Sequence, residues 1–465
     1  MRTDLLACRP VRRLVRAAGF PVAVQAFALA VVIALACAGL GIGASSSASE
    51  LMLLRKTNLA TLIVWGMWWP AMVALAIGAG RAWCTVCPME LVNRIGHGLA
   101  GRLGWPRARL GRVLRAGWLI VTIYVVMQLL VAGFSIHRVP HFTAVLLLVL
   151  GGGALLAGLV FREPRSFCIA FCPAGALLSV YGRLTPLQLE MRDPAVCAGC
   201  STKDCVRAGN RRRFNRQSCP SRLRPFDREP ADACVLCLQC AKVCPHDNVG
   251  FGLVAKEAPI RRKTLLRPAE AAFVLVALGF VSHEVIGEVK WLDEAFHVVP
   301  AGLASALPGV PFAWFEALWF LVLFPLMVWF AVVGLGRLAG HRGGIRPLLL
   351  AAATGAAPVV AVAHLAKAAA KVTAWGGFLP LALRDPRGSD TLHRIADHSL
   401  VPPAPFLSLT VIGWAMCPLV LFVTWRVWCG ARRIRADAIP ATRAGLIGAS
   451  VLFTSVLTVW SWVGR

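Results

Sequence analysis

The amino-acid sequence predicts a polytopic α-helical membrane protein of about nine transmembrane helices, with a small cysteine-rich domain inserted after the fourth. Of its 465 residues, 58% are hydrophobic and 15% are charged, and the mean hydropathy is +0.68. That balance is typical of proteins with several membrane-spanning helices. Eight of the 16 cysteines fall between positions 197 and 244, in a segment that interrupts the apolar pattern. We therefore expect three regions, at residues 1–192, 193–260 and 261–465.

Nine apolar stretches have the length of about 20 residues that a helix needs to cross the roughly 30 Å hydrocarbon layer of a bilayer. Four precede the cysteine-rich segment and five follow it. They cover residues 21–43, 58–80, 116–136, 142–161, 269–287, 312–336, 347–375, 406–427 and 441–463. The first is longer than the apolar core of a signal peptide and has no clear cleavage site, so we expect it to be retained as a helix.

The distribution of lysine and arginine predicts the orientation, because these residues favour cytoplasmic loops. Basic clusters precede the first helix, join the second to the third, close the cysteine-rich segment and precede the ninth helix. They comprise Arg9, Arg12, Arg13, Arg16, Arg102, Arg107, Arg109, Arg112, Arg115, Arg261, Arg262, Lys263, Arg267, Arg432, Arg433 and Arg435. With nine helices in a bacterial cytoplasmic membrane, the amino terminus and the cysteine-rich domain would face the cytoplasm and the carboxyl terminus would lie outside.

The end of the cysteine run has the spacing Cys234-x2-Cys237-x2-Cys240-x3-Cys244-Pro245. It matches the bacterial ferredoxin signature for 4Fe–4S clusters, in which three thiolates two residues apart hold one cluster. The fourth thiolate, followed by proline, ligates a neighbouring cluster. A second set of cysteines is therefore expected nearby.

The second set is Cys197-x2-Cys200-x4-Cys205, followed after a 13-residue insert by Cys219-Pro220. The crossed arrangement of two-cluster ferredoxins assigns Cys197, Cys200, Cys205 and Cys244 to one 4Fe–4S cluster and Cys219, Cys234, Cys237 and Cys240 to the other. The set departs from the usual pattern in having four residues instead of two before its third cysteine. Zinc ligation and disulfides are the alternatives. Neither explains two Cys-Pro pairs, and a reducing cytoplasm disfavours disulfides.

A repeated motif follows the second and fourth apolar stretches. It reads Arg-Ala-Trp-Cys84-Thr-Val-Cys87-Pro in the first copy and Arg-Ser-Phe-Cys168-Ile-Ala-Phe-Cys172-Pro in the second. Each proline precedes an amphipathic stretch and suits the first turn of a helix, so two parallel helical hairpins are expected. The four thiolates then converge on a third site, which would hold an additional iron–sulfur cluster or copper(I). Structural cysteines or a redox-active dithiol are the alternatives.

Over roughly residues 58–250, these motifs resemble the membrane-anchored polyferredoxins that include the quinol-dehydrogenase subunit of periplasmic nitrate reductase and the nitrous-oxide-reductase maturation regulator. Cys168 and Cys172 match the Cys-x3-Cys-Pro spacing of that family, whereas Cys84 and Cys87 are one residue short of it. The resemblance implies electron transfer through clusters on the cytoplasmic side. The five carboxyl-terminal helices have no counterpart there, so the partner and the direction of electron flow do not carry over.

Ionisable residues in the carboxyl-terminal helices are candidates for a quinone site, because charged groups are costly inside a membrane. A quinol site would use a histidine to hydrogen-bond a ring oxygen and a carboxylate to accept its proton. The candidates are His283, Glu284, His364 and Lys367, with Lys371 on the same helix face. Snorkelling lysines and a structural histidine are the alternative. The pairs His137 with His141 and Asp293 with His297 have the i, i+4 spacing of metal or haem ligands, or cap helix ends.

The predicted function is electron transfer between the quinone pool or a membrane redox subunit and a partner, through two 4Fe–4S clusters. The run Arg211-Arg212-Arg213 is a candidate docking surface for an acidic soluble electron carrier, or a solvated basic surface. The net charge of +27 is better explained by topology and anionic lipids than by nucleic acid. The alternatives are a copper-ion reductase or metalloenzyme assembly factor, which resembles the membrane cupric reductases of oxidase biogenesis, and a membrane scaffold with structural zinc.

Overall fold

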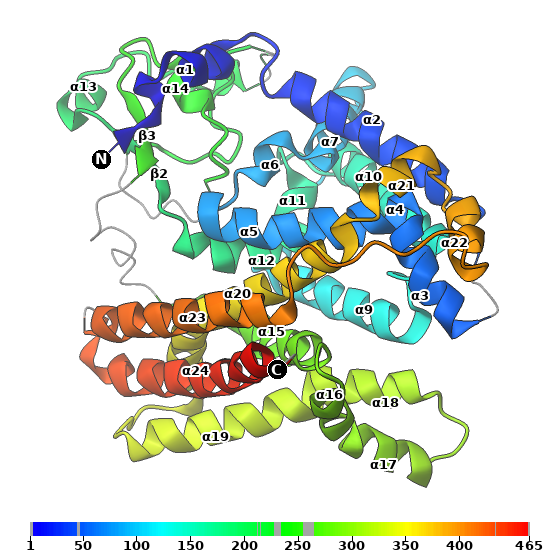
Figure 1. Cartoon of the computed structure of the whole chain (residues 1–465). Coiled ribbons are helices and arrows are strands. Elements are labelled where there is room, and N and C mark those ends of the chain that lie inside the picture. Colours follow the sequence, from blue (N-terminus) through cyan, green and yellow to red (C-terminus); the bar gives the residue numbers. More distant parts are fainter. Residues whose placement is uncertain are drawn as a thin grey trace. The chain divides into compact units, whose positions relative to one another are not determined.

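The computed structural model describes residues 3–43, 47–211, 213, 215–226, 234–253, 265–432 and 434–463 (Figure 1). Several residues singled out in the sequence lie outside this described part. They are Arg212 of the candidate docking run, the basic residues Arg261, Arg262, Lys263 and Arg433, and the expected domain boundary at residues 260 and 261.

All nine predicted apolar stretches are helical. They form α2 (Val22–Gly39), α4–η2–α5 (Leu59–Thr61, Leu62–Trp68 and Trp69–Ala79), α9 (Trp118–Phe134), α10 (Pro140–Val160), α15 (Pro268–Ile286), α18–η7–α19 (Phe312–Leu318, Trp319–Leu323 and Phe324–Leu338), α20 (Ile345–Gly376), α23 (Leu409–Ala431) and α24 (Ile439–Trp462). In the described residues, eight helices are long and apolar enough to cross a membrane. The remaining helix, α9, has 17 residues, which is at the lower limit for a span. These helices support a multi-pass membrane protein.

The chain forms two compact units, and each draws on separate stretches of sequence. Unit 1 comprises Met1–Ile33, Leu75–Leu119 and Leu148–Arg262, and unit 2 comprises Ala34–Ala74, Ile120–Leu147 and Lys263–Arg465. All twelve cysteines of the predicted cluster and Cys-Pro motifs belong to unit 1. The predicted pocket residues of the carboxyl-terminal helices belong to unit 2.

A three-stranded antiparallel sheet organises the cysteine-rich part of unit 1. Its order is β1 (Thr3–Asp4), β3 (Val249–Leu253), β2 (Leu187–Met191), with Thr3 opposite Leu253 and Leu189 opposite Phe251. The strand next to the amino terminus therefore completes a sheet whose other strands flank the cysteines. Short helices accompany it: η1 (Leu5–Ala7), α1 (Arg9–Arg16), η3 (Gly182–Leu184), α13 (Pro194–Ala198), η4 (Ala208–Asn210) and α14 (Gln239–Val243).

The core under this sheet joins the amino terminus to the cysteine run. Leu6 and Val15 pack with Leu238, Cys240 and Val249, all of them buried. The ammonium of Lys242 donates to the carbonyl oxygens of Ala17 (2.6 Å) and Phe20 (3.1 Å), just after α1 ends. These contacts hold α1 against the segment that carries the cysteines.

The remaining helices of unit 1 carry the Cys-Pro repeat. They are α6 (Trp83–Val86), α7 (Pro88–Arg102), α8 (Arg112–Arg115), α11 (Ser166–Ala170) and α12 (Ala174–Tyr181). The buried Asn93 side chain of α7 donates to the Ala154 carbonyl of α10 (3.0 Å) and to the Ser166 hydroxyl of α11 (3.1 Å). The Asn93 amide therefore connects α7, which follows the first copy of the motif, both to α10 and to α11, which carries part of the second copy.

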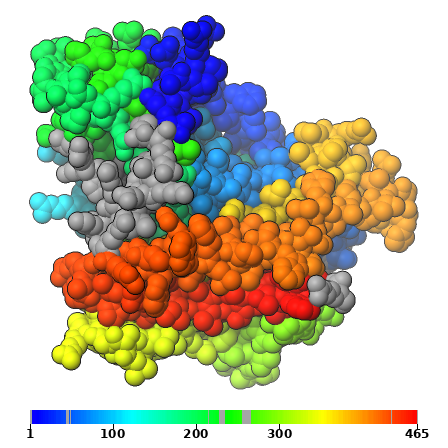
Figure 2. All heavy atoms as spheres, turned by 60° about the vertical axis from the view of Figure 1, so that its left-hand side comes forward, coloured from blue at the N-terminus to red at the C-terminus, as the bar shows by residue number. Residues whose placement is uncertain are grey.

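Unit 2 is a bundle in which α20 packs against α15, α23 and α24, and α23 and α24 lie side by side in orange and red in Figure 2. Small residues allow this packing. A Cβ on Gly355 of α20 would meet the Thr442 carbonyl oxygen of α24, and one on Gly445 would meet the Ala352 carbonyl. Such close backbone approach is usual between membrane helices. Shorter helices complete the unit: α3 (Ala48–Thr57), α16 (Lys290–Phe296), α17 (Val298–Ala306), α21 (Leu379–Arg384), α22 (Ser389–Ala396) and η8 (Ala436–Ala438).

Candidate functional site

Asn248 contacts two cysteines of the first predicted set. Its Nδ2 donates to the Cys197 sulfur at 3.2 Å, and its backbone N–H donates to the Cys244 sulfur at 3.4 Å. The same Nδ2 donates to the Asp193 carbonyl (2.6 Å), while the Asp193 carboxylate caps α13. Two cysteines 47 positions apart, as their numbers give, are thereby held together.

One pocket is lined by four cysteines, Cys197, Cys200, Cys205 and Cys244, and is bordered by Met191, Val196, Pro225, Phe226 and Val249. Burial and the neighbouring thiolates of Cys244 and Cys197 raise the pKa of Cys205 to about 11. At Cys200, hydrogen bonds from Thr202 and the Lys203 backbone lower the pKa to about 7. A positively charged metal centre would relieve the mutual repulsion of these thiolates, so the donor set fits a thiolate-bound metal site.

The cysteines of the second predicted set lie next to those of the first. Cys237 lies between Leu236 (φ 52°) and Leu238 (φ 57°), two residues in the left-handed region, and Cys240 lies in α14. Burial, followed by the thiolates of Cys237, Cys234 and Cys219, raises the pKa of Cys240 well above its usual value. The Cys219 backbone N–H donates to the Cys205 carbonyl at 2.8 Å, which brings the two sets next to each other. Left-handed conformations are rare in leucine and mark a tightly constrained loop.

The four cysteines of the repeat form the third group. Cys84 lies in α6 and Cys168 in α11, while Cys87 and Cys172 directly precede the helices that begin near Pro88 and Pro173. Burial raises the pKa of Cys87 well above its usual value, with further contributions from the thiolates of Cys168, Cys172 and Cys84. It raises the pKa of Cys172 to about 12. The two copies of the motif therefore bring their sulfurs together in a buried place.

A buried arginine accompanies this third group. Arg165 has a left-handed backbone (φ 61°) and is only 5% exposed. Although burial alone would lower its pKa, the thiolates of Cys168 and Cys84, the Glu90 carboxylate and the Cys237 thiolate raise it. One guanidinium thus lies near thiols of both the second and the third group, where it stabilises negative charge.

Hydrogen bonds also connect the repeat to the cysteine-rich loop. The Thr85 hydroxyl, between Cys84 and Cys87, donates to the carbonyl of Val235, between Cys234 and Cys237, at 2.7 Å. The Gln25 side chain of α2 donates to the Thr85 carbonyl (2.8 Å) and to the Glu90 carboxylate (2.6 Å). Residues beside the sulfurs of the second and third groups are therefore in direct contact.

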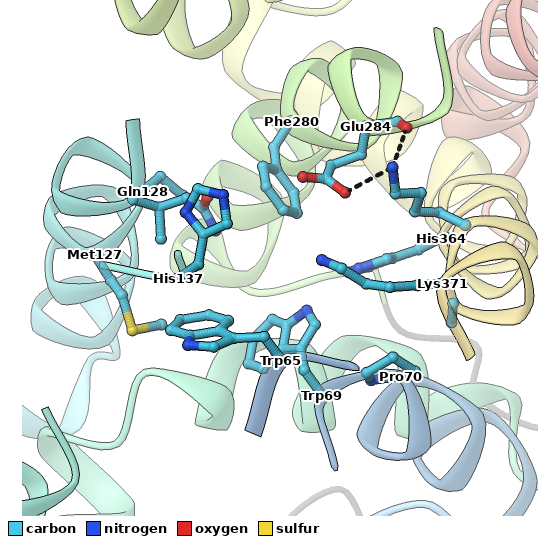
Figure 3. A pocket seen from close by; sticks show the side chains of 13 residues that line it. Trp65, Trp69, Pro70, Met127, Gln128, His137, Phe280, Glu284, His364 and Lys371 are labelled. Carbon is cyan, nitrogen blue, oxygen red and sulfur yellow. Dashed lines mark hydrogen bonds and ion pairs between the residues drawn. The ribbon is translucent and has the colours of Figure 1, made fainter. Parts of the chain in front are cut away.

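Unit 2 contains a pocket among its apolar helices (Figure 3). Aromatic residues form much of its wall, and polar groups from four different parts of the chain face it. The lining comprises Trp65, Trp69, Pro70, Met127, Gln128, Val131, His137, Phe280, Glu284, His364, Lys367, Ala368 and Lys371. A mostly apolar pocket with a few polar groups is the usual form of a small-molecule site.

Lysine and glutamate form the ionic part of the pocket. Lys367 Nζ donates to the Glu284 carbonyl oxygen (2.8 Å) and to the Glu288 carboxylate (2.7 Å), and lies 3.2 Å from the Glu284 carboxylate. Lys371 Nζ lies 5.4 Å from the ring centroid of Trp375. Burial, followed by the charges of Arg138, Lys371 and Arg55, lowers the pKa of His137 well below its usual value. Its Nδ1 is buried and has no hydrogen-bond partner among the described residues.

The pocket brings together Glu284, His364 and Lys367 of the predicted quinone residues, but His283 does not line it. His283 instead faces Glu316, with its Nε2 3.7 Å from the Glu316 carboxylate, and its ring stacks on Phe320. The i, i+4 pair Asp293 and His297 contacts the same glutamate through His297. His141 Nδ1 accepts a hydrogen bond from the Gly41 backbone at 3.2 Å, away from the pocket lining.

Sequence reasoning did not assign several of these residues to a site. Each copy of the repeat has an arginine three residues before its first cysteine, Arg81 in the first copy and Arg165 in the second. This repeated arginine could have pointed to a role for Arg165 beside the cysteines. Glu316 is a lone acid within an apolar stretch, which is a known sign of function in a membrane helix. Trp65 and Gln128 come from separate helices, and only the fold shows that they share a pocket with His137, which the sequence singled out only for its spacing to His141.

The comparisons with known proteins find partial relatives. Uncharacterized protein MJ0749 of Methanocaldococcus jannaschii is 28% identical over 188 residues, which is 40% of this chain and 69% of that protein. Uncharacterized protein MJ0750 of the same organism is 24% identical over 138 residues, which is 30% of this chain and 50% of that protein. No family model matches the sequence, and no solved structure matches the chain.

Proposed function

We propose that this protein is a membrane-bound iron–sulfur electron-transfer protein, which passes electrons between the quinone pool or a membrane partner and a redox partner through two 4Fe–4S clusters. The observation that carries the proposal is the grouping of twelve cysteines of unit 1 into three sets of four. Two of these sets follow the crossed assignment of a two-cluster ferredoxin, in which the fourth ligand of each set comes from the other half of the sequence.

The cysteine spacing favours iron–sulfur clusters over zinc in the first two sets, because zinc does not account for two Cys-Pro fourth ligands. Cys197, Cys200, Cys205 and Cys244 line one pocket. The bound clusters would supply one-electron redox chemistry. This chain's own residues would tune it: Asn248 donates to the sulfurs of Cys197 and Cys244, and Arg165 places positive charge beside Cys168 and Cys84.

The small sheet supports the proposed topology. Because β1 pairs with β3, the amino terminus and the cysteine-rich segment must be on the same side of a membrane. An even number of crossings therefore separates β1 from β2, and the apolar helices between them are α2, α4–η2–α5, α9 and α10. The number of crossings is even, at four, only if α9 also crosses, so the sheet favours a membrane crossing by this 17-residue helix. The basic loops favour the cytoplasm as the shared side, with anionic lipids as neighbours and the carboxyl terminus outside.

The pocket of unit 2 is the proposed quinone site. Oxidation of a quinol to a quinone releases two electrons and two protons, so the site must bind the ring, accept protons and pass electrons on. The aromatic wall suits a flat ring, His364 and His137 suit its oxygens, and Glu284 and Glu288 suit the protons. The electrons would leave one at a time through the clusters, toward a membrane subunit or a soluble carrier that docks at the basic cytoplasmic surface.

Metal and acid-labile sulfide analysis of anaerobically purified protein tests the proposal, together with low-temperature electron paramagnetic resonance of the reduced sample. About eight irons per chain would support the two ferredoxin-type clusters, and about twelve would add a third cluster on the Cys-Pro repeat. Zinc without iron would overturn the electron-transfer proposal and favour a scaffold. A matched comparison is Cys237→Ser, which should lose cluster signal, against Cys429→Ser, whose exposed cysteine belongs to none of the three sets.

A copper-ion reductase or metalloenzyme assembly factor is the second candidate, and the third cysteine set favours it. Four thiols, two of them buried and two partly buried, form with a neighbouring guanidinium a soft donor set that suits copper(I) as well as iron. Under this alternative, purified protein would contain copper with about eight irons. Serine at Cys84 and Cys168 would then abolish copper reduction and leave the ferredoxin-type signals intact. Loss of about four irons in the same variant would identify a third cluster instead.

A further inference from the structure

Three potential metal ligands from different elements of unit 2 meet outside the pocket and outside the cysteine sets. They are His283 of α15, His297 between α16 and α17, and Glu316 of α18. One ligand atom from each lies within 4.8 Å of the other two. His297 Nε2 is 3.1 Å and His283 Nε2 is 3.7 Å from the Glu316 carboxylate oxygen. Ligands of a tetrahedral ion with bonds of about 2.0–2.1 Å lie about 3.3–3.4 Å apart, a value between these two distances.

The hydrogen bond on the other side of His297 sets its orientation. His297 Nδ1 lies 2.8 Å from the Asp293 carbonyl oxygen, which can only accept, so Nδ1 carries the proton in the neutral ring. The Asp293 carboxylate lies 3.2 Å from the same nitrogen. The Nε2 lone pair then points toward Glu316. Histidines that bind metals are usually held in this way, by a carbonyl or a carboxylate on the second ring nitrogen.

Aromatic rings fix the positions of both imidazoles. The His283 ring stacks on Phe320 with a centroid distance of 4.5 Å and an angle of 10° between the planes. Phe296 and Phe312 border the His297 ring at 5.7 and 6.0 Å. All three side chains are partly exposed, at 22% for His283, 17% for His297 and 25% for Glu316. An ion and one water molecule therefore have access to them. A rigid apolar shell with a small opening is characteristic of a metal site with an open coordination position.

We propose that His283, His297 and Glu316 bind a divalent first-row transition metal ion, with Zn²⁺ as the best match to the two imidazoles and one carboxylate. A hydrogen-bonded ion pair accounts for His297 and Glu316 but not for His283, which is too far from the carboxylate for a hydrogen bond at 3.7 Å. A bound cation satisfies both imidazoles and the carboxylate at once. The site uses none of the cysteines and none of the pocket residues, so it is independent of the proposed electron-transfer function.

The test uses full-length detergent-solubilised protein with one equivalent of Zn²⁺, and X-ray absorption at the zinc edge. The expected spectrum has only nitrogen and oxygen neighbours at about 2.0–2.1 Å, with the outer-shell features of two imidazoles. Sulfur neighbours at about 2.3 Å would place the zinc on cysteines and would overturn the assignment. Because this measurement uses the unmodified protein, it does not depend on the folding of any variant.

Variants give the second readout. His297→Gln and Glu316→Gln should each weaken zinc binding at least about tenfold in equilibrium dialysis, whereas the exposed His393→Gln of α22 should leave it unchanged. Zinc should also raise the thermal unfolding midpoint of the wild-type protein and of His393→Gln, because it binds only the folded state. Unchanged zinc affinity in both ligand variants would contradict the proposal and leave these residues as an ion pair only.

Discussion

The hydroxyl of Thr85 donates a 2.7 Å hydrogen bond to the carbonyl oxygen of Val235, and both groups are buried. Each residue lies directly beside a cysteine, Thr85 after Cys84 and Val235 after Cys234. A backbone-anchored contact of this kind fixes the spacing between the second and third cysteine groups. Electron transfer between two such groups would depend on that spacing.

Replacing the Thr85 hydroxyl by a methyl group should therefore loosen this contact. Thr85→Val keeps the shape of the side chain but leaves the buried Val235 carbonyl without its donor, which costs about 1–3 kcal/mol. We expect a lower thermal unfolding midpoint by circular dichroism and loss of the cluster absorption at a lower temperature. Thr85→Ser keeps the hydroxyl and is the control, and equal destabilisation in the two variants would contradict the role of the hydrogen bond.

The Asp4 carboxylate should give unit 1 a pH-dependent contribution to stability. Burial alone would raise its pKa, but hydrogen bonds from Arg192 and from the Leu6 and Phe251 backbones hold it below the ordinary value of 3.8. The stabilisation is therefore present above pH 3.8 and is lost as the pH falls through the lower, folded-state pKa. Asp4→Asn should cost about 1–2 kcal/mol at pH 7, since the carboxylate is partly exposed.

The measurement is the difference in unfolding midpoint between wild type and Asp4→Asn from pH 7 down to pH 3. This difference should stay constant down to about pH 4 and shrink below it. Asp397→Asn, at an exposed position of the same charge type, is measured over the same pH range as the control variant. A difference that grows on acidification would contradict the assignment.

His364 should be needed for reduction of the protein by quinol. It lines the pocket of unit 2 with Glu284 and Lys367, and its ring lies 5.8 Å from Phe280 and 6.5 Å from Trp69. In His364→Ala, a soluble quinol analogue should no longer reduce the clusters, whereas dithionite still should. Reduction is followed by loss of visible absorption. His393→Ala, in the same unit but exposed, should behave like wild type, and full quinol reduction of His364→Ala would exclude this pocket.

The contact between α20 and α24 should tolerate no side chain at Gly355. Its Cβ would meet the Thr442 carbonyl oxygen, which belongs to backbone and cannot turn aside. Gly355→Ala should therefore destabilise unit 2 by about 1–3 kcal/mol through overpacking. Gly334→Ala on α19 is a matched control, because open space surrounds that position. The readout is the temperature at which the detergent-solubilised protein aggregates, and similar temperatures for the two variants would contradict the packing argument.

Helix formation in the apolar stretches could be predicted from the sequence, because long apolar runs must satisfy their backbone hydrogen bonds internally. All nine predicted stretches are helical. The internal π-helical segment η2 and the short helices α16 and α17 were not predicted, since these depend on tertiary packing. The crossed grouping of the eight cysteines stays a prediction from spacing and a general ligation rule. The structure adds that Asn248 contacts the sulfurs of Cys197 and Cys244.

Contacts between residues far apart in the chain could not be predicted from the sequence. His283 and Glu284 are adjacent in the sequence, yet Glu284 lines the pocket while His283 lies beside His297 and Glu316. The reason is that neighbouring positions on a helix point about 100° apart. Periodicity placed both near one end of α15 but did not say which helices would face them. The pairing of Thr3–Asp4 with the strand near position 250 was likewise not foreseen, because a two-residue strand carries no detectable alternation.

That pairing has a consequence for biosynthesis. Strand β1 leaves the ribosome first, but its partner β3 follows about 250 residues later, which at 5–20 residues per second is a wait of roughly 12–50 s. During this interval four apolar helices are made, and the amino-terminal segment has no strand to pair with. Closure of the sheet, and with it a finished pocket for the first cysteine set, can only come after those helices have been synthesised. If unit 1 binds the proposed clusters, delivery of metal and sulfide to this part of the chain would be a late event, after the ribosome has passed position 253.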